Sequence, residues 1–313
     1  PDTTPAIWGA GNDILWAQGE ALMICGGQGT GKTTLAHQVI RARLGLDAQV
    51  LGFPVEPSDS AVLYMAMDRP AQAARAMRRI MTETDRHALD DRLRIWAGPP
   101  PGDIARHPEL FVDMATETGA ATIVVDSLKD AAVKLSDDEV GATYNRARQK
   151  ALAAGIEILE LHHQRKTGSG GSRPDSVSDV YGSTWLTSGA GSVLMLNAEP
   201  GDLIVEARHI KQPANDVGPL RVIHDHDSGR SRLDEAVDLI ELAARTDGIT
   251  ATDAACALFE SAAPSRNDIE KARRRLDRLT DTGQLRRVDG LGRGNPTAYM
   301  PIKPASDWRG AAS

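Results

Sequence analysis

A glycine-rich segment near the amino end of the chain, residues 26–33, limits the possible folds more than any other feature. It reads GGQGTGKT and fits the pattern GxxxxGK[ST]. An apolar run stands directly before it and an amphipathic helical pattern directly after it, as the motif requires. Such a loop turns its backbone N–H groups inward at the amino end of a helix, where they bind phosphate. We therefore expect an α/β fold that binds a nucleoside triphosphate, rather than a chance glycine-rich turn.

The residues of this loop have predicted roles at the nucleotide. The residues predicted to bind it are Gly26, Gly27, Gln28, Gly29, Thr30, Gly31, Lys32, Thr33 and Thr34. Among them, Lys32 is expected to neutralise the β and γ phosphates of ATP, and the hydroxyl of Thr33 to bind Mg²⁺. The predicted cofactors are therefore ATP and Mg²⁺.

Two aspartates follow apolar runs and are candidates for the remaining chemistry. Asp126 ends the run in TIVVDS, and a buried strand that ends in Asp can supply a carboxylate to the magnesium ion. Asp68 ends LYMAMD and would lie at the same sheet edge as Lys32, where it could polarise the attacking water as a general base. Each has a structural alternative, because Asp126 could cap a turn and Asp68 could cap the helix predicted after it.

Short apolar runs rich in β-branched residues alternate with helical patterns between about residue 14 and residue 210. Strands are predicted at residues 21–25, 61–65, 93–97, 122–125, 156–161, 192–196 and 203–209. Helices are predicted at residues 32–44, 71–83, 108–118 and 142–154. This alternation is typical of βαβ units around a largely parallel sheet.

The character of the chain changes after Asp225. We interpret residues 1–224 as the ATPase domain and 225–234 as a polar linker. Residues 235–303 would form a second domain, and residues 304–313 a flexible tail. Helices are predicted at 235–245, 251–260 and 265–282, and strands at 284–288 and 297–302. Three helices followed by a β-hairpin are typical of a winged helix, a variant of the helix-turn-helix.

Composition excludes several classes of protein. The chain has 313 residues, of which 41% are hydrophobic and 25% charged, as in soluble globular proteins. No apolar run approaches the roughly 18 residues of a membrane span. Cys25 and Cys256 stand outside any cluster of Cys and His. We therefore expect a cytoplasmic protein without membrane contact, structural zinc or a disulfide.

Positive charge is concentrated near the carboxyl end, although the net charge of the chain is −7. Residues 266–303 contain ten Lys and Arg against five Asp and Glu. On a recognition helix and a basic wing, this charge predicts binding of duplex or fork DNA through Arg274, Arg275 and Arg287. The alternative is a winged helix that binds protein and leaves its basic face in solvent.

Four segments in order carry a resemblance to a known family. They are GGQGTGKTT (26–34), VLYMAMD (62–68), TIVVDS (122–127) and LELHHQRK (159–166), the last followed by YGSTWL (181–186). Together they resemble the RecA-like core of hexameric replicative helicases, of the RepA-like and DnaB-like groups, over residues 7–212. The resemblance implies a homo-oligomeric ring, expected to be a hexamer, that hydrolyses ATP and moves on single-stranded DNA in its central channel.

The resemblance also implies roles for single residues. The catalytic glutamate of the family falls on Asp68, which is one methylene shorter, and its Walker B aspartate falls on Asp126. Its histidine motif, which senses the γ-phosphate, falls on His162 and His163. Adjacent residues of a strand point to opposite faces, so only one of the two histidines can face the nucleotide. Buried or edge histidines without such a role are the alternative.

Two further sets of basic residues are implied. The family carries a Lys-x-Arg pair that reaches the nucleotide of a neighbouring subunit. Here Lys211 matches the lysine, Pro213 stands where arginine is expected, and Arg208 is the possible substitute. The family's DNA-binding loop falls on the polar, glycine-rich residues 165–179. The basic residues of that loop are Arg165, Lys166 and Arg173. A surface loop without a ligand is the alternative.

Two other functions remain open from the sequence. A recombination or repair ATPase of the RecA or RadA type would form filaments and pair strands. A nucleotide-gated DNA-binding regulator would use ATP to switch the second domain and would tolerate weak turnover. Asp68 and Pro213 both favour the regulator, because each departs from the residue that fast hydrolysis in the family uses.

Overall fold

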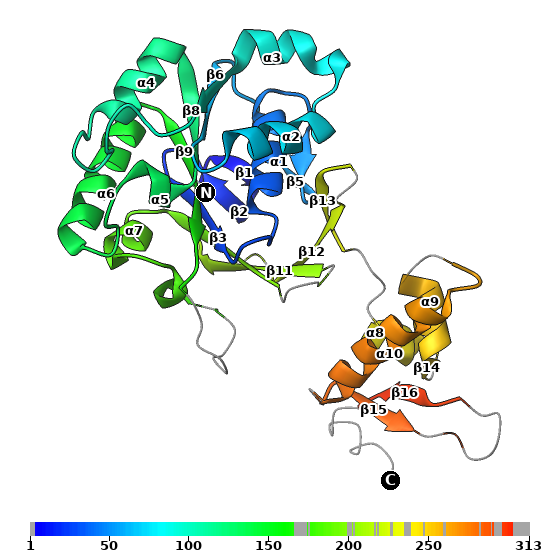
Figure 1. Ribbon diagram of the computed structural model, residues 1–313. Coiled ribbons are helices and arrows are strands. Elements are labelled where there is room, and N and C mark those ends of the chain that lie inside the picture. The colour runs from blue at the N-terminus through cyan, green and yellow to red at the C-terminus, as the bar shows by residue number, and fades with distance from the viewer. Residues whose placement is uncertain are drawn as a thin grey trace. The chain divides into compact units, whose positions relative to one another are not determined.

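The computed structural model places most of the chain in two compact units, Pro1–Asp234 and Glu235–Ser313 (Figure 1). It describes residues 4–165, 174, 176–198, 202, 204–215, 217, 219–225, 228–234, 239–246, 248–258, 261–281, 283–288, 290 and 296–302. Among these residues, no helix has both the length and the apolar character needed to cross a membrane.

A nine-stranded sheet forms the centre of the first unit, in the order β13-β12-β11-β10-β3-β9-β8-β6-β7. Its parallel part consists of β10 (Ser192–Asn197), β3 (Leu22–Gly26), β9 (Glu157–His163), β8 (Ala120–Asp126), β6 (Ala61–Ala66) and β7 (Leu93–Ala97). Its antiparallel edge consists of β11 (Ile204–Lys211), β12 (Leu220–Asp225) and β13 (Arg230–Leu233). The predicted α/β class with a largely parallel sheet is confirmed.

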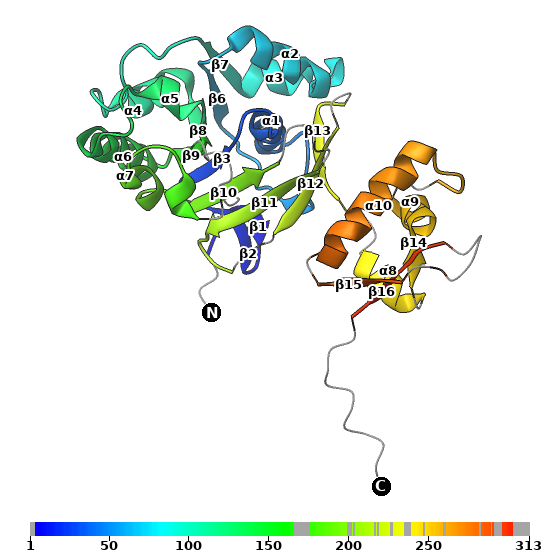
Figure 2. The same ribbon diagram turned by 60° about the horizontal axis from the view of Figure 1, so that its bottom comes forward.

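Helices cover both faces of this sheet, as Figures 1 and 2 show. One face carries α1 (Lys32–Arg43), α2 (Pro70–Ile80) and α3 (Arg86–Arg92). The other carries α4 (Leu110–Thr118), α5 (Leu128–Ala131), α6 (Asp138–Ala153) and α7 (Thr184–Ser188). Alternate strand residues supply the two cores, because successive side chains of a strand point to opposite faces. Leu22 and Ile24 thus pack in the α1 core, and Met23 and Cys25 in the α6 core.

Short elements complete the first unit around its sheet. They are β1 (Ala6–Ala10), β2 (Asp13–Ala17), β4 (Gln49–Val50), β5 (Phe53–Pro54), and the 3₁₀ turns η1 (Glu83–Asp85) and η2 (Val177–Asp179). β1 and β2 pair as an antiparallel hairpin, which buries Trp8 and Trp16 in the α1 core.

The predicted linker at residues 225–234 is wrong. Residues 230–233 form β13, which pairs with β12 and closes the edge of the sheet beside α1, so the first unit ends at residue 234 rather than 224. The polar side chains that looked like a linker have partners elsewhere in the unit. Arg230 pairs with Asp47 at 3.1 Å, and Ser231 is buried against Gln38.

The second unit contains α8 (Leu239–Arg245), β14 (Ile249–Thr250), α9 (Ala251–Leu258), α10 (Arg266–Asp281), β15 (Leu285–Val288) and β16 (Ala298–Pro301). Three helices and the last two strands are those expected, whereas β14 was not. The antiparallel sheet has the order β14-β16-β15 and packs on a small core that includes Leu239, Leu276 and Tyr299. The hydroxyl of Ser265 accepts from the backbone N–H of Asp268 at 3.2 Å and caps α10. Residues 235–238 and 304–313 lie outside the described part of the chain.

Candidate functional site

The glycine-rich loop lies where β3 ends and α1 begins, as expected. Gly31 is the residue before the helix and has a φ of 83°, in the left-handed region that favours glycine. Helix α1 starts at Lys32, so its first backbone N–H groups are available at the loop. Strand, loop and helix together form the anion-binding arrangement that the sequence predicts.

Lys32 folds over this loop. Its Nζ donates to the carbonyl of Gly26 at 3.0 Å and to that of Gly27 at 2.6 Å. Burial lowers the pKa of Lys32 to about 8, and the charge of Asp126 opposes that shift. The ammonium therefore lies inside the loop, where a phosphate oxygen would replace carbonyl groups as its partner.

Asp126 and Thr33 come together at the carboxyl end of β8. The Oδ2 atom of Asp126 accepts from the Thr33 hydroxyl at 3.1 Å and from the Tyr64 hydroxyl at 2.8 Å. Because Tyr64 donates to Asp126, its oxygen accepts from Nε2 of His37, which lies 3.0 Å away. Burial raises the pKa of Asp126, while the bonds from Tyr64 and Thr33 lower it. One hydroxyl and one carboxylate side by side fit Mg²⁺, which binds few protein oxygens and takes its other ligands from phosphate and water.

Asp68 lies at the same sheet edge in a different environment. Strands β6 and β8 run in register, with Ala66 opposite Asp126, so Asp68 follows β6 by two residues at this edge. Its carboxylate is half-exposed and lies 3.2 Å from Nζ of Lys129. The alternative that Asp68 caps the next helix is wrong, because Arg69 occupies the N-cap of α2 and no side chain caps it.

The two histidines lie on opposite faces of β9. His163 shares the face of Leu159 and Leu161, which belongs to α1, and its pKa is lowered by burial and by the charges of Lys32 and Lys129. His162 is buried on the other face, and its Nε2 donates to the carbonyl of Tyr181 at 2.7 Å. Burial lowers the pKa of His162 to about 4. His163 therefore lies on the face of the sheet that carries α1, and His162 binds the segment that returns after residue 176.

Four residues beside the loop were missed from the sequence. Gln164 donates its backbone N–H to the carbonyl of Gly26 at 3.4 Å, and its Nε2 would lie 3.8 Å from a Cβ at Gly27. Lys129 pairs with Asp68, and Tyr64 supports Asp126. His224 of β12 contacts the loop itself. Gln164 and Lys129 stand close to motif residues in the sequence, whereas nothing in the pattern marks Tyr64 or His224.

The residues predicted to act on a neighbouring subunit have partners within the chain. Lys211 donates to the carbonyls of Thr187 and Ser188, at 3.0 and 2.8 Å. It pairs in register with Val193 at the amino end of β10, the edge opposite the phosphate loop. Arg208 forms an ion pair with Glu206. Their role at a neighbour's nucleotide stays a prediction.

The predicted DNA-binding residues are described only in part. Arg165 is exposed at the end of the β9 segment, and its backbone N–H donates to the carbonyl of Asp179 at 2.7 Å. Lys166 and Arg173 lie outside the described residues. In the second unit, Arg274 on α10 and Arg287 on β15 are exposed. Arg275 lies in α10, and its side chain is outside what the structure describes.

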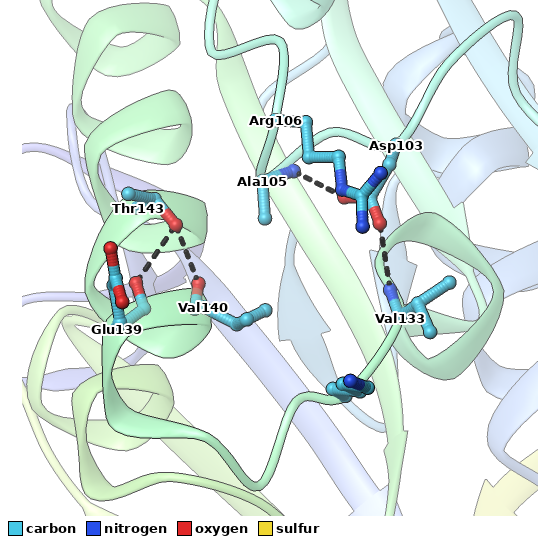
Figure 3. Close-up of a pocket in the computed structure, with 8 residues that line it drawn as sticks. Asp103, Ala105, Arg106, Val133, Glu139, Val140 and Thr143 are labelled. Carbon is cyan, nitrogen blue, oxygen red and sulfur yellow. Dashed lines mark hydrogen bonds between the residues drawn. The ribbon is translucent and has the colours of Figure 1, made fainter.

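A cavity of about 260 Å³ lies on the α6 side of the first unit (Figure 3). It is lined by Asp103, Arg106, Val133, Glu139 and Thr143 among others, and by none of the predicted site residues. The carboxylate of Asp103 accepts from the backbone N–H groups of Ala105 and Val133, at 2.9 and 3.0 Å. These bonds join two loops of the chain. We assign the cavity no function, because none of the predicted site residues lines it.

Comparison with known proteins bears on the site. A family model described as an AAA domain matches residues 8–169, just over half of the chain. The chain is also similar to a solved structure whose title describes an ATPase domain, with 15% identity over 69% of this chain and 85% of that chain, and a TM-score of 0.49. No curated protein matches the chain. The family match contains the phosphate loop, Asp68, Asp126 and His163, and the chain thus belongs to the AAA domain family and is a P-loop ATPase.

Proposed function

We propose that the chain couples hydrolysis of Mg-ATP to movement on single-stranded DNA, as a helicase or translocase of the RepA-like or DnaB-like type. One observation supports this most. The end of β9, with His163 and Gln164, lies beside the phosphate loop, and the chain continues from there directly into Arg165 and the basic segment 165–179.

The composition of that segment suits a single strand. Basic side chains among glycines and serines can follow a phosphate backbone without reading its bases. Tyr181 and Trp185, on the return from the segment, are large and exposed. Exposed aromatic rings near basic groups can stack with unpaired bases. If the γ-phosphate displaced Gln164, the next residue, Arg165, and the basic segment after it would move as well. That segment and the exposed rings of Tyr181 and Trp185 suit single-stranded DNA.

The chemistry assigned to the nucleotide follows from the geometry. Thr33 and Asp126 would hold Mg²⁺, which neutralises charge on the phosphates. Lys32 would contact the β and γ phosphates from inside the loop. Asp68 would orient the attacking water, and His163 would respond to the γ-phosphate from the face that it shares with α1.

The proposal extends to assembly and to the second unit. We expect a homo-oligomeric ring, a hexamer by resemblance, in which Lys211 or Arg208 reaches a neighbouring nucleotide. The order α8-β14-α9-α10-β15-β16 with an antiparallel sheet supports a winged helix. Its α10 and β15 would present Arg274 and Arg287 to duplex or fork DNA.

The ion pair between Asp68 and Lys129 favours a second candidate, a nucleotide-gated DNA-binding regulator. The Asp68 carboxylate lies 3.2 Å from the ammonium of Lys129, so one of its oxygens faces that cation rather than an attacking water. Slow hydrolysis would suit a protein that switches between an ATP state and an ADP state rather than one that moves continuously.

Hydrolysis measured with and without single-stranded DNA separates the two candidates. Lys32→Ala serves as the blank, since it removes the ammonium from the loop. Stimulation of about tenfold or more by single-stranded DNA, absent with an equal mass of duplex, supports the motor. A slow rate that DNA leaves unchanged, in a protein that still binds ATP, contradicts the motor and supports the regulator.

A further inference from the structure

His224 of β12 lies against the backbone of the phosphate loop. Its Nε2 is 2.8 Å from the carbonyl oxygen of Thr30, and the side chain is buried, with the residue 9% exposed. A Cβ added to Gly31 would lie only 2.0 Å from the same nitrogen. The imidazole therefore contacts the loop at two successive residues, on the peptide unit that joins them.

The hydrogen bonds of His224 select one tautomer of its neutral ring. A carbonyl oxygen can only accept, so Nε2 carries the hydrogen and donates to Thr30. Nδ1 is then the acceptor, and it receives the hydroxyl hydrogen of Ser231 at 2.6 Å. Ser231 is itself held by Gln38 of α1, whose side chain accepts from the Ser231 N–H at 2.7 Å and donates to the Ser231 carbonyl at 2.9 Å.

The strand β13, which carries Ser231, has further contacts at the two residues before this serine. Arg230 pairs with Asp47 at 3.1 Å, and a Cβ on Gly229 would lie 3.0 Å from side-chain atoms of Arg79 and Ile80. Figures 1 and 2 show β13 beside α1. These contacts hold β12 and β13 against α1, and His224 reaches the loop from β12.

The contact with Thr30 controls the direction of a phosphate-binding group. The peptide unit is planar, so the Thr30 carbonyl and the Gly31 N–H point in opposite directions and rotate together. Gly31, with a φ of 83°, has no side chain to restrict the orientation of this unit. By binding the carbonyl on the outside of the loop, His224 keeps the Gly31 N–H turned away from the hairpin.

We propose that His224 is a positioning residue for ATP: it orients the Thr30–Gly31 peptide so that the loop is ready to bind phosphate before the nucleotide arrives. The proposal rests on ATP binding at this loop and is independent of any action on DNA. It gives the β12–β13 hairpin a role in nucleotide affinity.

Two substitutions separate the hydrogen bond from the packing of the ring. His224→Phe keeps a ring of similar size but has no donor. His224→Gln keeps an N–H donor near the position of Nε2 but has no ring. We expect His224→Phe to raise the Kd and the KM for ATP roughly tenfold, as for loss of a hydrogen bond to a buried acceptor, and to change kcat by less than about threefold. His224→Gln should stay within about threefold of the unsubstituted chain in Kd and KM.

His209 offers a matched control. It is a buried histidine on the neighbouring strand β11, and its Nε2 lies 2.7 Å from the hydroxyl of Ser192. Residue 192 pairs with Leu22, at the opposite end of β3 from the phosphate loop. His209→Phe should lower the melting temperature as His224→Phe does, and leave the Kd for ATP unchanged.

All measurements are made without DNA, by calorimetric titration of ATP and by steady-state hydrolysis, so they hold whether or not DNA stimulates the rate. Ser231→Ala keeps the ring and removes the donor to Nδ1, and should raise the Kd about threefold. The proposal is overturned if folded His224→Phe binds ATP as the unsubstituted chain does. It is also overturned if His224→Gln binds as weakly as His224→Phe, since packing and not donation would then be the cause.

Discussion

Asp126 and Asp68 lie at the ends of neighbouring strands at one sheet edge, yet they differ in burial and in the hydrogen-bonding or charged groups nearest to them. Asp126 is partly buried and accepts from two hydroxyls, whereas Asp68 is half-exposed and pairs with an ammonium. Hydroxyl groups orient a carboxylate without neutralising it, so Asp126 keeps its charge available for a cation. Lys129 lies 3.2 Å from the Asp68 carboxylate, in an exposed pair that water screens. Two identical side chains thus have different surroundings, which suit the roles proposed for them, a metal ligand at Asp126 and a base at Asp68.

The largest effect is expected from Asp126→Asn, which changes the more buried of the two carboxylates. The amide keeps the shape but loses the charge that binds Mg²⁺, so kcat should fall about a thousandfold or more, as for a metal ligand of a phosphoryl-transfer site. Steady-state hydrolysis over a range of magnesium concentrations checks this. A rate within tenfold at saturating magnesium would mean that another carboxylate holds the ion.

Asp68→Asn changes the more exposed of the two carboxylates and tests whether it acts as the base. Loss of a general base that orients water should lower kcat about a hundredfold and leave the KM for ATP nearly unchanged, because the residue acts on the water and not on the bound nucleotide. Asp91→Asn is a suitable control, since Asp91 is an exposed aspartate that forms only a surface pair with Arg92. If both substitutions change the rate equally, Asp68 has no part in the reaction.

ATP binding is expected to depend on pH through the protonation of Lys32, whose charge interacts with Asp126. The pKa of Lys32 is lowered to about 8 in the folded chain, so the ammonium that meets the phosphates loses its proton as pH rises through that value. kcat/KM should therefore fall about tenfold between pH 7 and pH 9, below the range in which an exposed lysine titrates. Asp126→Asn removes a charge that supports the proton, so the decline in ATP affinity, measured by titration, should begin at lower pH. A flat affinity up to pH 10 contradicts this assignment.

Lys129→Met is expected to give the smallest change, and in the opposite direction. Both members of the pair are more than a third exposed, so water screens their attraction and its loss alters the energy of Asp68 only slightly. The rate should rise about two- to fivefold. A fall in rate would show that Lys129 itself assists the reaction, and the pair would then be part of the machinery rather than a restraint on it.

The sequence predicts those parts of the molecule that depend on local pattern. The phosphate loop and the placement of Asp126 and Asp68 at strand ends follow from short segments, because each needs only a strand before it and a turn or helix after it. The β12–β13 hairpin could not be found in this way. Its polar residues looked like a linker, and their partners Gln38 and Thr30 stand more than 190 residues earlier in the chain. Tyr64 stands within the predicted strand 61–65, and its hydroxyl gains a role only through its bond to Asp126, 62 residues later in the chain.

The position of Asp234 has a practical consequence for dividing the molecule. Asp234 closes the first unit, because its side chain pairs with Arg221 at 2.8 Å and its backbone N–H donates to the Arg221 carbonyl at 2.7 Å. A gene fragment that stops after codon 234 retains the hairpin and the whole nucleotide site. A fragment that stops at codon 224 loses Arg230 and Ser231, and with them the support of His224. The longer fragment is the reference for asking what the second unit adds to turnover.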